Sequence, residues 1–362
     1  MAVFKGMKEN FPDIKLYVGG CASEVLDLQK RYPFIDGVFR RRNMIQDLAT
    51  YFGYDPKSDE EDPISNLHCV KIQTGCARSC GFCKKAYLKM PLCSKPIAKV
   101  LMDVKDSVSK GHHDIILLAE NATEYGIDLD DNIRLIDLLK AVVEIDGVES
   151  LYVSALCIDE LVLNPELVDY IKNCAKIHKV QLEIQSLIPE VRKNMRLTST
   201  VDDVLKLLGE FSEKYIITNI MLGYPGETTE NFKKQLKLIE KYGLYYVQIN
   251  VYDNTPLVYG NSFEQIPKSV VSERVTMITR TMTKVRNRKA TDIRMASKNE
   301  PVTCIYTTEG RFEIVGHAAI VELSKAPKCT SGQKVKVRVT GSKKLFSMFD
   351  PDQTMVLGGV QV

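Results

Sequence analysis

Apolar runs and helical patterns alternate along the middle of the chain. Six apolar, β-branched runs are typical of buried strands, and the stretches between them repeat apolar residues at helical spacing. The expected strands are 70–73, 114–118, 150–154, 180–185, 215–222 and 245–251, and the expected helices are 97–110, 132–145, 165–174, 201–213 and 228–242. Strands that alternate with helices form parallel βαβ units. The pattern predicts an α/β fold, and six strands over about 190 residues favour a partial (β/α)6 barrel over a flat sheet.

Smaller segments flank this core, which we place at residues 63–262. Residues 1–62 predict two or three αβ units, which is small for an independent domain. A basic helix is expected at 268–288, within a linker at 263–300. Residues 301–362 contain short alternating strands and predict an all-β domain. There is no apolar run of 18 residues, and the charged N-terminus is unlike a secretory signal, so no membrane partner is expected.

Composition and charge narrow the class of protein. The 362 residues are 44% hydrophobic and 26% charged, which predicts a folded chain with a sizeable core. Basic residues number 49 and acidic residues 46, and the net charge of +3 favours no particular partner. Ten cysteines without an export signal predict a cytoplasmic protein whose thiols bind metal or stay reduced.

Three of these cysteines lie close together in the run IQTGCARSCGFCKKAY. The spacing C-x3-C-x2-C allows Cys76, Cys80 and Cys83 to converge on one small metal centre. A structural zinc site normally has four ligands, and a [4Fe–4S] cluster is normally held by four cysteines. Three ligands would leave one iron of such a cluster open to a substrate or cofactor. A zinc site and three unrelated thiols stay as alternatives. The triplet follows the first barrel strand, at the end where such barrels hold their chemistry.

This triplet, with Phe82 before its last cysteine, resembles the signature of radical S-adenosylmethionine (SAM) enzymes. The resemblance implies a [4Fe–4S] cluster on Cys76, Cys80 and Cys83 whose open iron chelates SAM. In that family an electron from the cluster cleaves SAM into methionine and a 5′-deoxyadenosyl radical. An electron-donor protein is therefore an expected partner. The cofactor carries the difficult chemistry, and the protein orients the reactants and excludes water.

From about residue 10 to the C-terminus the chain is similar to the methylthiotransferases, which modify tRNA or a ribosomal protein. The run MLGYPGETTENF at 221–232 is close to the family's Gly-Phe-Pro-Gly-Glu-Thr. Gly223 and Gly226 permit positive φ there, and Thr228 or Thr229 can cap the next helix. The run KMPLCSKP departs from the family pattern, because neighbouring lysines replace its two arginines.

The resemblance also implies a set of SAM-contacting residues at strand ends. Glu120, in LLAENATEYG, stands where such enzymes place a polar group for the SAM amino group, although it could be an ordinary loop carboxylate. The run IQS at 184–186 matches the family, but Leu187 replaces the usual glycine, and Leu197 follows where an arginine often stands. The implied cofactor-binding residues are Phe82, Glu120, Ser154, Gln185, Arg196 and Gly223.

The C-terminal tail is locally basic. Residues 325–344 carry seven basic residues and no acidic one. Lys334, Lys336 and Arg338 alternate with valines, so a strand would place the three cations on one face. Such a face suits contact with phosphates, although it could be merely solvated. The tail resembles the TRAM domain, an RNA-binding β-barrel, and implies that the tRNA anticodon stem-loop is a partner. The expected RNA-binding residues are Lys334, Lys336, Arg338, Lys343 and Lys344.

The N-terminal segment departs from the family. Methylthiotransferases hold a second [4Fe–4S] cluster on three cysteines of a larger N-terminal domain, and Cys21 resembles only the third of them. One thiolate cannot anchor a cluster, so a second cluster is expected only if the N-terminal half is completed. The sequence could be truncated, a separate chain could supply the missing half, or the second cluster could be lost. Without it, hydrogen abstraction could survive while sulfur insertion should not.

These patterns lead to one principal hypothesis. It describes a tRNA methylthiotransferase that adds a methylthio group at C2 of a modified adenosine next to the anticodon. A methylthiotransferase of a ribosomal protein, or a radical SAM relative without sulfur insertion, is the alternative within enzymes. A non-catalytic RNA-binding protein with a structural metal site is the alternative of another class.

Overall fold

The computed structural model describes residues 2–20, 27–40, 48–51, 53, 69–85, 91–254, 258–307, 311–325, 327–344 and 355–362. They fall into two compact units, one of residues 1–62 with 83–90 and one of residues 63–82 with 91–362. No helix among these residues is both long and apolar enough to cross a membrane.

The smaller unit contains a short parallel sheet. Its elements are α1 (Ala2–Asn10), β1 (Tyr17–Gly20), α3 (Leu28–Arg31) and β2 (Gly37–Arg40), with β1 paired to β2. Asp36 precedes β2 and accepts a hydrogen bond from the Leu16 amide at 2.8 Å and one from Lys8 Nζ at 2.9 Å. These bonds hold the pKa of Asp36 at about 2. Cys21, the expected auxiliary-cluster ligand, lies outside the described residues.

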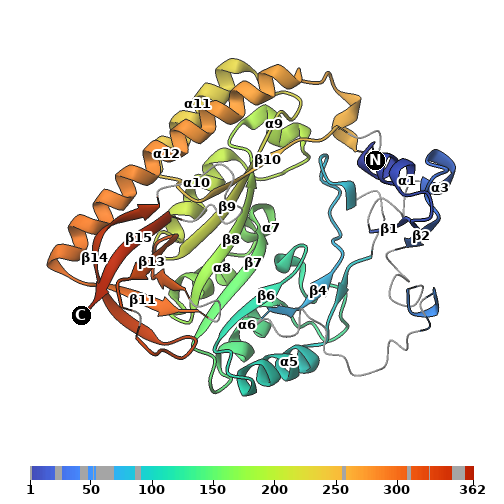
Figure 1. The fold of residues 1–362 in the computed structure, drawn as a ribbon. Coiled ribbons are helices and arrows are strands. Elements are labelled where there is room, and N and C mark those ends of the chain that lie inside the picture. Colours follow the sequence, from blue (N-terminus) through green and yellow to red (C-terminus); the bar gives the residue numbers. More distant parts are fainter. Residues whose placement is uncertain are drawn as a thin grey trace. The chain divides into compact units, whose positions relative to one another are not determined.

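A six-stranded parallel sheet forms the centre of the larger unit (Figure 1). Its strands, in spatial order, are β10 (Val247–Val251), β9 (Tyr215–Leu222), β8 (Ile177–Gln185), β7 (Ser150–Cys157), β6 (Asp114–Leu118) and β3 (Cys69–Lys71). The sheet has two edge strands and does not close. The predicted α/β fold with a partial barrel is therefore confirmed.

Helices between the strands cover one face of this sheet. They are α5 (Ile97–Ser109), α6 (Leu135–Val143), α8 (Pro165–Asn173), α10 (Val201–Glu210) and α11 (Thr229–Lys241). Along β8, Val180 and Leu182 are fully buried in the core, whereas Gln181 and Glu183 alternate with them on the other face. This strand therefore turns polar side chains toward the inner face of the partial barrel.

Short elements gather where the strands end or the chain turns. They are β4 (Gln73–Thr74), which pairs with β5 (Cys93–Ser94), the helices α7 (Ile158–Val162) and α9 (Pro189–Asn194), and the 3-10 turns η3 (Ala122–Glu124) and η4 (Tyr259–Ser262). The helices α7 and α9 begin within a few residues of the carboxyl ends of β7 and β8. These elements carry most of the candidate site.

The helix expected at 268–288 is longer in the structure. It runs as α12 from Lys268 to Asn299 and lies beside α11 (Figure 1). The expected end was wrong because Ala290 and Ile293 continue the helical spacing and pack into the C-terminal core. No proline interrupts the helix before Pro301.

The C-terminal segment forms a closed five-stranded barrel, as the all-β expectation required. Its strands are β11 (Val302–Tyr306), β12 (Phe312–Ile314), β13 (Ala319–Leu323), β14 (Lys334–Lys344) and β15 (Met355–Gln361). Cys304, Val337 and Leu357 are fully buried in its core. Closure removes exposed strand edges.

Polar contacts join this barrel to the amino ends of the parallel strands. Glu313 of β12 accepts a hydrogen bond from Lys179 Nζ at 2.8 Å, and its other oxygen lies 3.1 Å from His178 Nε2. Burial would raise the pKa of Glu313, but the charge of Lys179 and the contacts of His178 hold it at about 2. The Tyr245 hydroxyl also accepts a hydrogen bond from the Ala318 amide at 2.6 Å. The barrel thus docks at the amino-terminal edge of the sheet, away from the strand carboxyl ends.

Candidate functional site

The first two cysteines of the triplet lie in the loop after β4. Cys76 Sγ accepts a hydrogen bond from the Arg78 amide at 3.4 Å, and Glu124 of η3 accepts one from the Ala77 amide at 3.0 Å. Burial, with Glu124 nearby, raises the pKa of Cys76 to about 12. A bound metal ion would favour the thiolate instead. Cys83 belongs to the smaller unit, and the described residues contain no preassembled group of three metal-ligating side chains.

The residues after Cys80 are firmly anchored in the larger unit. The Gly81 amide donates to the Met195 carbonyl at 2.8 Å, and the Gly81 carbonyl accepts from the Gly260 amide at 2.9 Å. A Cβ at Gly81 would lie 2.7 Å from both the Asn194 carbonyl oxygen and the Tyr224 hydroxyl. Only glycine therefore fits between these partners. Phe82, an expected cofactor-binding residue, packs on an apolar cluster of Ile188, Val191, Met195 and Tyr224.

The loop after β9 has the conformation expected from its glycines. Gly223 and Gly226 have φ values of +77° and +96°, and Thr228 caps α11 by accepting a hydrogen bond from the Asn231 amide at 3.2 Å. A Cβ at Gly223 would lie 2.7 Å from a methyl carbon of Val271 on α12. The loop is therefore packed directly against that helix.

A buried carboxylate that sequence analysis did not single out holds this loop. Glu227 Oε1 accepts hydrogen bonds from the Gly223 amide at 3.2 Å and from Arg274 Nη1 of α12 at 2.7 Å. Burial raises the pKa of Glu227, although Arg274 acts in the opposite direction. The Gly-Glu-Thr run contained this residue, but its partner lies 47 positions away and no local pattern connects the two.

Ser154, near the end of β7, uses its hydroxyl to join neighbouring strands. The hydroxyl donates to the Leu117 carbonyl at 2.8 Å and accepts from the Ala119 amide at 3.3 Å. Glu120 follows directly and is half-buried. Next to it, Asn121 is 3% exposed, and its buried Nδ2 has no hydrogen-bond partner among the described residues.

Gln185, at the end of β8, presents a hydrogen-bond acceptor. Its backbone has a φ of +63°, which is strained for a residue with a side chain. Its Nε2 donates to Glu183 Oε2 at 2.9 Å, and Asn219 donates to the same oxygen. Because the carboxylate takes the amide nitrogen, Oε1 of Gln185 faces elsewhere, and it is buried without a partner in the described part of the chain.

Arg196 lies exposed just beyond α9. Its φ is +60°, and its guanidinium carbon lies 3.7 Å above the centre of the Tyr259 ring. This cation–π contact accounts for the side-chain position without a ligand. Its expected role in SAM binding stays a prediction.

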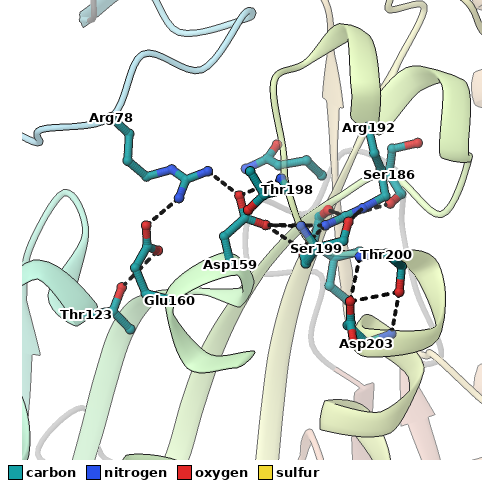
Figure 2. A network of polar contacts seen from close by, with 12 residues as sticks. Arg78, Thr123, Asp159, Glu160, Ser186, Arg192, Thr198, Ser199, Thr200 and Asp203 are labelled. Atoms are coloured by element: carbon teal, nitrogen blue, oxygen red, sulfur yellow. Dashed lines mark hydrogen bonds and ion pairs between the residues drawn. The ribbon is translucent and has the colours of Figure 1, made fainter. Parts of the chain in front are cut away.

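An ion network links the cysteine loop to α7 (Figure 2). Arg78 forms ion pairs through Nη2 with Asp159 and through Nη1 with Glu160. Asp159 also accepts hydrogen bonds from the Thr198 and Ser199 amides, each at 2.9 Å. Burial opposes ionisation, but the bonds from Ser199 and Thr198 and the charge of Arg78 hold the pKa of Asp159 at about 2.

Arg192 extends this network to the end of β8. Its Nη1 donates to the carbonyls of Ile184 and Ser186 at 2.8 and 3.0 Å, and its Nε donates to the Ser199 carbonyl at 2.9 Å (Figure 2). Arg192 therefore holds the backbone of the residues before and after Gln185. Sequence analysis missed Arg78, Asp159 and Arg192, because they meet only through the fold.

The basic strand of the C-terminal barrel alternates as expected. Lys334, Lys336 and Arg338 are exposed on β14, whereas Val335 and Val337 between them are buried. Within the described ranges none of the three cations forms an ion pair. The side chains of Lys343 and Lys344 lie outside the described residues. The alternation is confirmed, and RNA binding by this face stays a prediction.

Comparisons with known proteins agree with this arrangement. The radical SAM superfamily model matches residues 70–239. A ribosomal protein uS12 methylthiotransferase RimO from Dictyoglomus thermophilum is 30% identical over 261 residues, which cover 66% of this chain and 59% of that protein. A tRNA-2-methylthio-N(6)-dimethylallyladenosine synthase from Clostridium tetani is 27% identical over 267 residues, with coverages of 67% and 58%. The chain is therefore similar to the radical SAM methylthiotransferases. It spans less than two thirds of the length of these two relatives.

A further relative covers more of the chain, and a solved structure has a similar fold over part of it. A tRNA-2-methylthio-N(6)-dimethylallyladenosine synthase from Roseobacter denitrificans is 25% identical over 371 residues, covering 94% of this chain and 83% of that protein. Among solved structures, the radical S-adenosylmethionine methyltransferase TsrM from Kitasatospora setae has a TM-score of 0.48 and 15% identity, covering 69% of this chain and 57% of that chain. Radical SAM proteins use a [4Fe–4S] cluster and SAM, the two cofactors expected from the cysteine triplet.

Proposed function

We propose that this chain is a radical SAM enzyme whose cluster is held by Cys76, Cys80 and Cys83. The observation that carries this proposal is the cysteine loop itself, which combines three thiols at radical SAM spacing with a backbone fixed at Gly81. Three soft thiolate donors suit an iron–sulfur cluster. When bound, the cluster and SAM supply an organic radical that abstracts a hydrogen atom, with the electron coming from a donor protein.

The partial barrel offers polar groups that fit SAM. Gln185 Oε1 is a buried acceptor, and Asn121 Nδ2 is a buried donor, each without a partner among the described residues. Buried polar atoms are normally satisfied, so unsatisfied ones at strand ends support a polar ligand. Glu183 orients the Gln185 amide, and Arg192 holds the strand end below it. We assign roles in SAM binding to Phe82, Glu120, Ser154, Gln185, Arg196 and Gly223.

We further propose that the substrate is a tRNA adenosine next to the anticodon, modified at C2. The exposed cations of β14 support an RNA substrate, because they form one uncompensated face. The names of several relatives also include tRNA modification. A ribosomal protein is the second candidate, because a relative at 30% identity is named for that substrate. Sulfur insertion requires the auxiliary cluster, and hence completion of the ligand set that Cys21 would join.

Iron and sulfide quantification tests the cluster. The anaerobically reconstituted protein should bind about four irons with matching labile sulfide, and Cys76→Ala should lose them. Cys93→Ala is the matched control, because Cys93 is exposed on β5 outside the triplet. About four irons remaining in Cys76→Ala would indicate a second cluster, and no iron in the unmodified protein would contradict the proposal.

Turnover and binding then test the reaction and the substrate. With a reductant and SAM, the loaded protein should form 5′-deoxyadenosine, and an anticodon stem-loop should increase that yield. Binding of the stem-loop should weaken steeply with salt. Stimulation by ribosomal protein uS12 and not by the RNA would favour the second candidate.

A further inference from the structure

Arg78 lies inside the cysteine loop, and the fold holds its guanidinium firmly. Its side chain is 17% exposed and bridges Asp159 and Glu160 of α7 (Figure 2). Asp159 is itself fixed by two backbone amides and by Ser199. The ion pairs with Asp159 and Glu160 therefore fix the guanidinium to residues outside the cysteine loop. Arg78 itself lies between Cys76 and Cys80 in the sequence, so its positive charge is held close to this loop.

One donor of this guanidinium is left over. Arg78 Nε is buried and has no hydrogen-bond partner among the described residues. A buried N–H without an acceptor is costly and calls for an explanation. An acceptor bound at the loop, such as a sulfur of an iron–sulfur cluster, would satisfy it.

Two sulfur atoms of the loop, those of Cys76 and Cys80, lie within hydrogen-bond reach of Arg78. The Arg78 amide donates to Cys76 Sγ at 3.4 Å. The guanidinium lies within hydrogen-bond reach of Cys80, and an arginine side chain stays protonated in proteins. The side chain thus remains a permanent cation next to a predicted cluster ligand.

We propose that Arg78 is a positioning residue that sets the reduction potential of the cluster, with Asp159 and Glu160 holding it in place. Hydrogen bonds to sulfur and nearby positive charge stabilise the reduced, more negative cluster. The step is a one-electron transfer from the donor protein, which takes the cluster from the 2+ to the 1+ state and breaks no bond. The inference rests on the proposed function, since it requires the cluster to form.

Potentiometric titration followed by electron paramagnetic resonance of the reduced cluster tests this role in the reconstituted full chain. Arg78→Met should lower the equilibrium constant for cluster reduction about tenfold, which is about 59 mV for one electron. Arg78→Lys should restore part of that loss. Glu160→Gln keeps a side-chain oxygen that can accept the hydrogen bond from Arg78 Nη1 but removes a negative charge, so it should shift the potential in the opposite direction. Glu190→Gln, an exposed carboxylate on α9, is the matched control and should leave the potential unchanged.

The outcomes separate this inference from the proposed function. Absence of a cluster in the unmodified protein would overturn both. If the cluster forms but all variants titrate within twofold of the unmodified protein, the tuning role is overturned and the proposed function stands. Shifts of the same sign in Arg78→Met and Glu160→Gln would indicate general loosening and also overturn it. If Arg78→Met cannot retain iron, the opposite-sign test passes to Arg78→Lys and Glu160→Gln.

Discussion

Replacing Glu313 by Gln should weaken the attachment of the C-terminal barrel to the partial barrel. The change keeps the shape of the side chain but removes the charge that faces Lys179 and His178. The Glu313 side chain is 9% exposed and that of Lys179 17% exposed, so water compensates poorly for the lost partner. Removing one member of a buried ion pair typically costs about 3–5 kcal/mol.

The pKa of Glu313 gives a second route to the magnitude. Folding lowers this pKa from 4.5 to about 2, and each unit corresponds to about 1.4 kcal/mol. The ionised carboxylate thus contributes about 3 kcal/mol to the free energy of unfolding at neutral pH. Because the folded pKa is the lower one, this contribution is complete above pH 4.5 and is lost as the pH falls toward 2. By pH 3 it should be less than half its neutral value.

Urea unfolding at pH 7, 5, 4 and 3 measures this contribution. The difference in unfolding free energy between the unmodified protein and Glu313→Gln should be about 3 kcal/mol at pH 7 and should narrow on acidification. Glu300→Gln provides the control, because Glu300 is an exposed carboxylate at the end of α12. A difference below about 0.5 kcal/mol at pH 7, or one that is constant with pH, would refute the argument.

Two further changes test the cysteine loop and the basic face. Gly81→Ala would place a methyl group 2.7 Å from a backbone oxygen and should lower both iron retention and melting temperature, whereas Gly209→Ala, in an open position on α10, should stabilise the protein by up to about 1 kcal/mol. Equal effects of the two substitutions on iron retention would argue against the steric explanation. Replacing Lys334, Lys336 and Arg338 together by Ala should reduce the salt dependence of tRNA binding by about two to three phosphate contacts, measured by fluorescence anisotropy between 50 and 200 mM salt. An unchanged salt slope would show that RNA binds elsewhere.

The sequence predicted the central strands well for a physical reason. Strands buried in a parallel sheet are largely apolar runs. The pattern of apolar residues along the chain therefore predicted the bounds of β6 and β9 as the structure has them. The last 11 residues of α12 were missed because the exposed face there mixes charged and apolar residues, such as Asp292, Arg294 and Met295, and only a narrow stripe packs against the barrel.

The candidate site was predictable only where its signal is local. The triplet and the Gly-Tyr-Pro-Gly-Glu-Thr run are contiguous in sequence, and so both were recognised. The partners of Arg78 lie 81 and 82 positions away in the sequence. Glu183 orients the Gln185 side chain by accepting a hydrogen bond from its amide nitrogen. No periodicity encodes such meetings, because they depend on how the strands are brought together.

The long helix α12 touches two distant parts of the larger unit. Its Val271 packs on Gly223 of the strand-end loop, and its Ser297 accepts a hydrogen bond from the Val339 amide of β14 at 3.1 Å. About 26 residues of helix separate these contacts, a span of about 39 Å at 1.5 Å per residue. The length of the helix therefore sets the distance between the strand-end loop and the C-terminal barrel. Insertion of a single residue would shift the barrel contact by about 1.5 Å and turn it by about 100°, so the length of this helix is as constrained as the identity of a site residue.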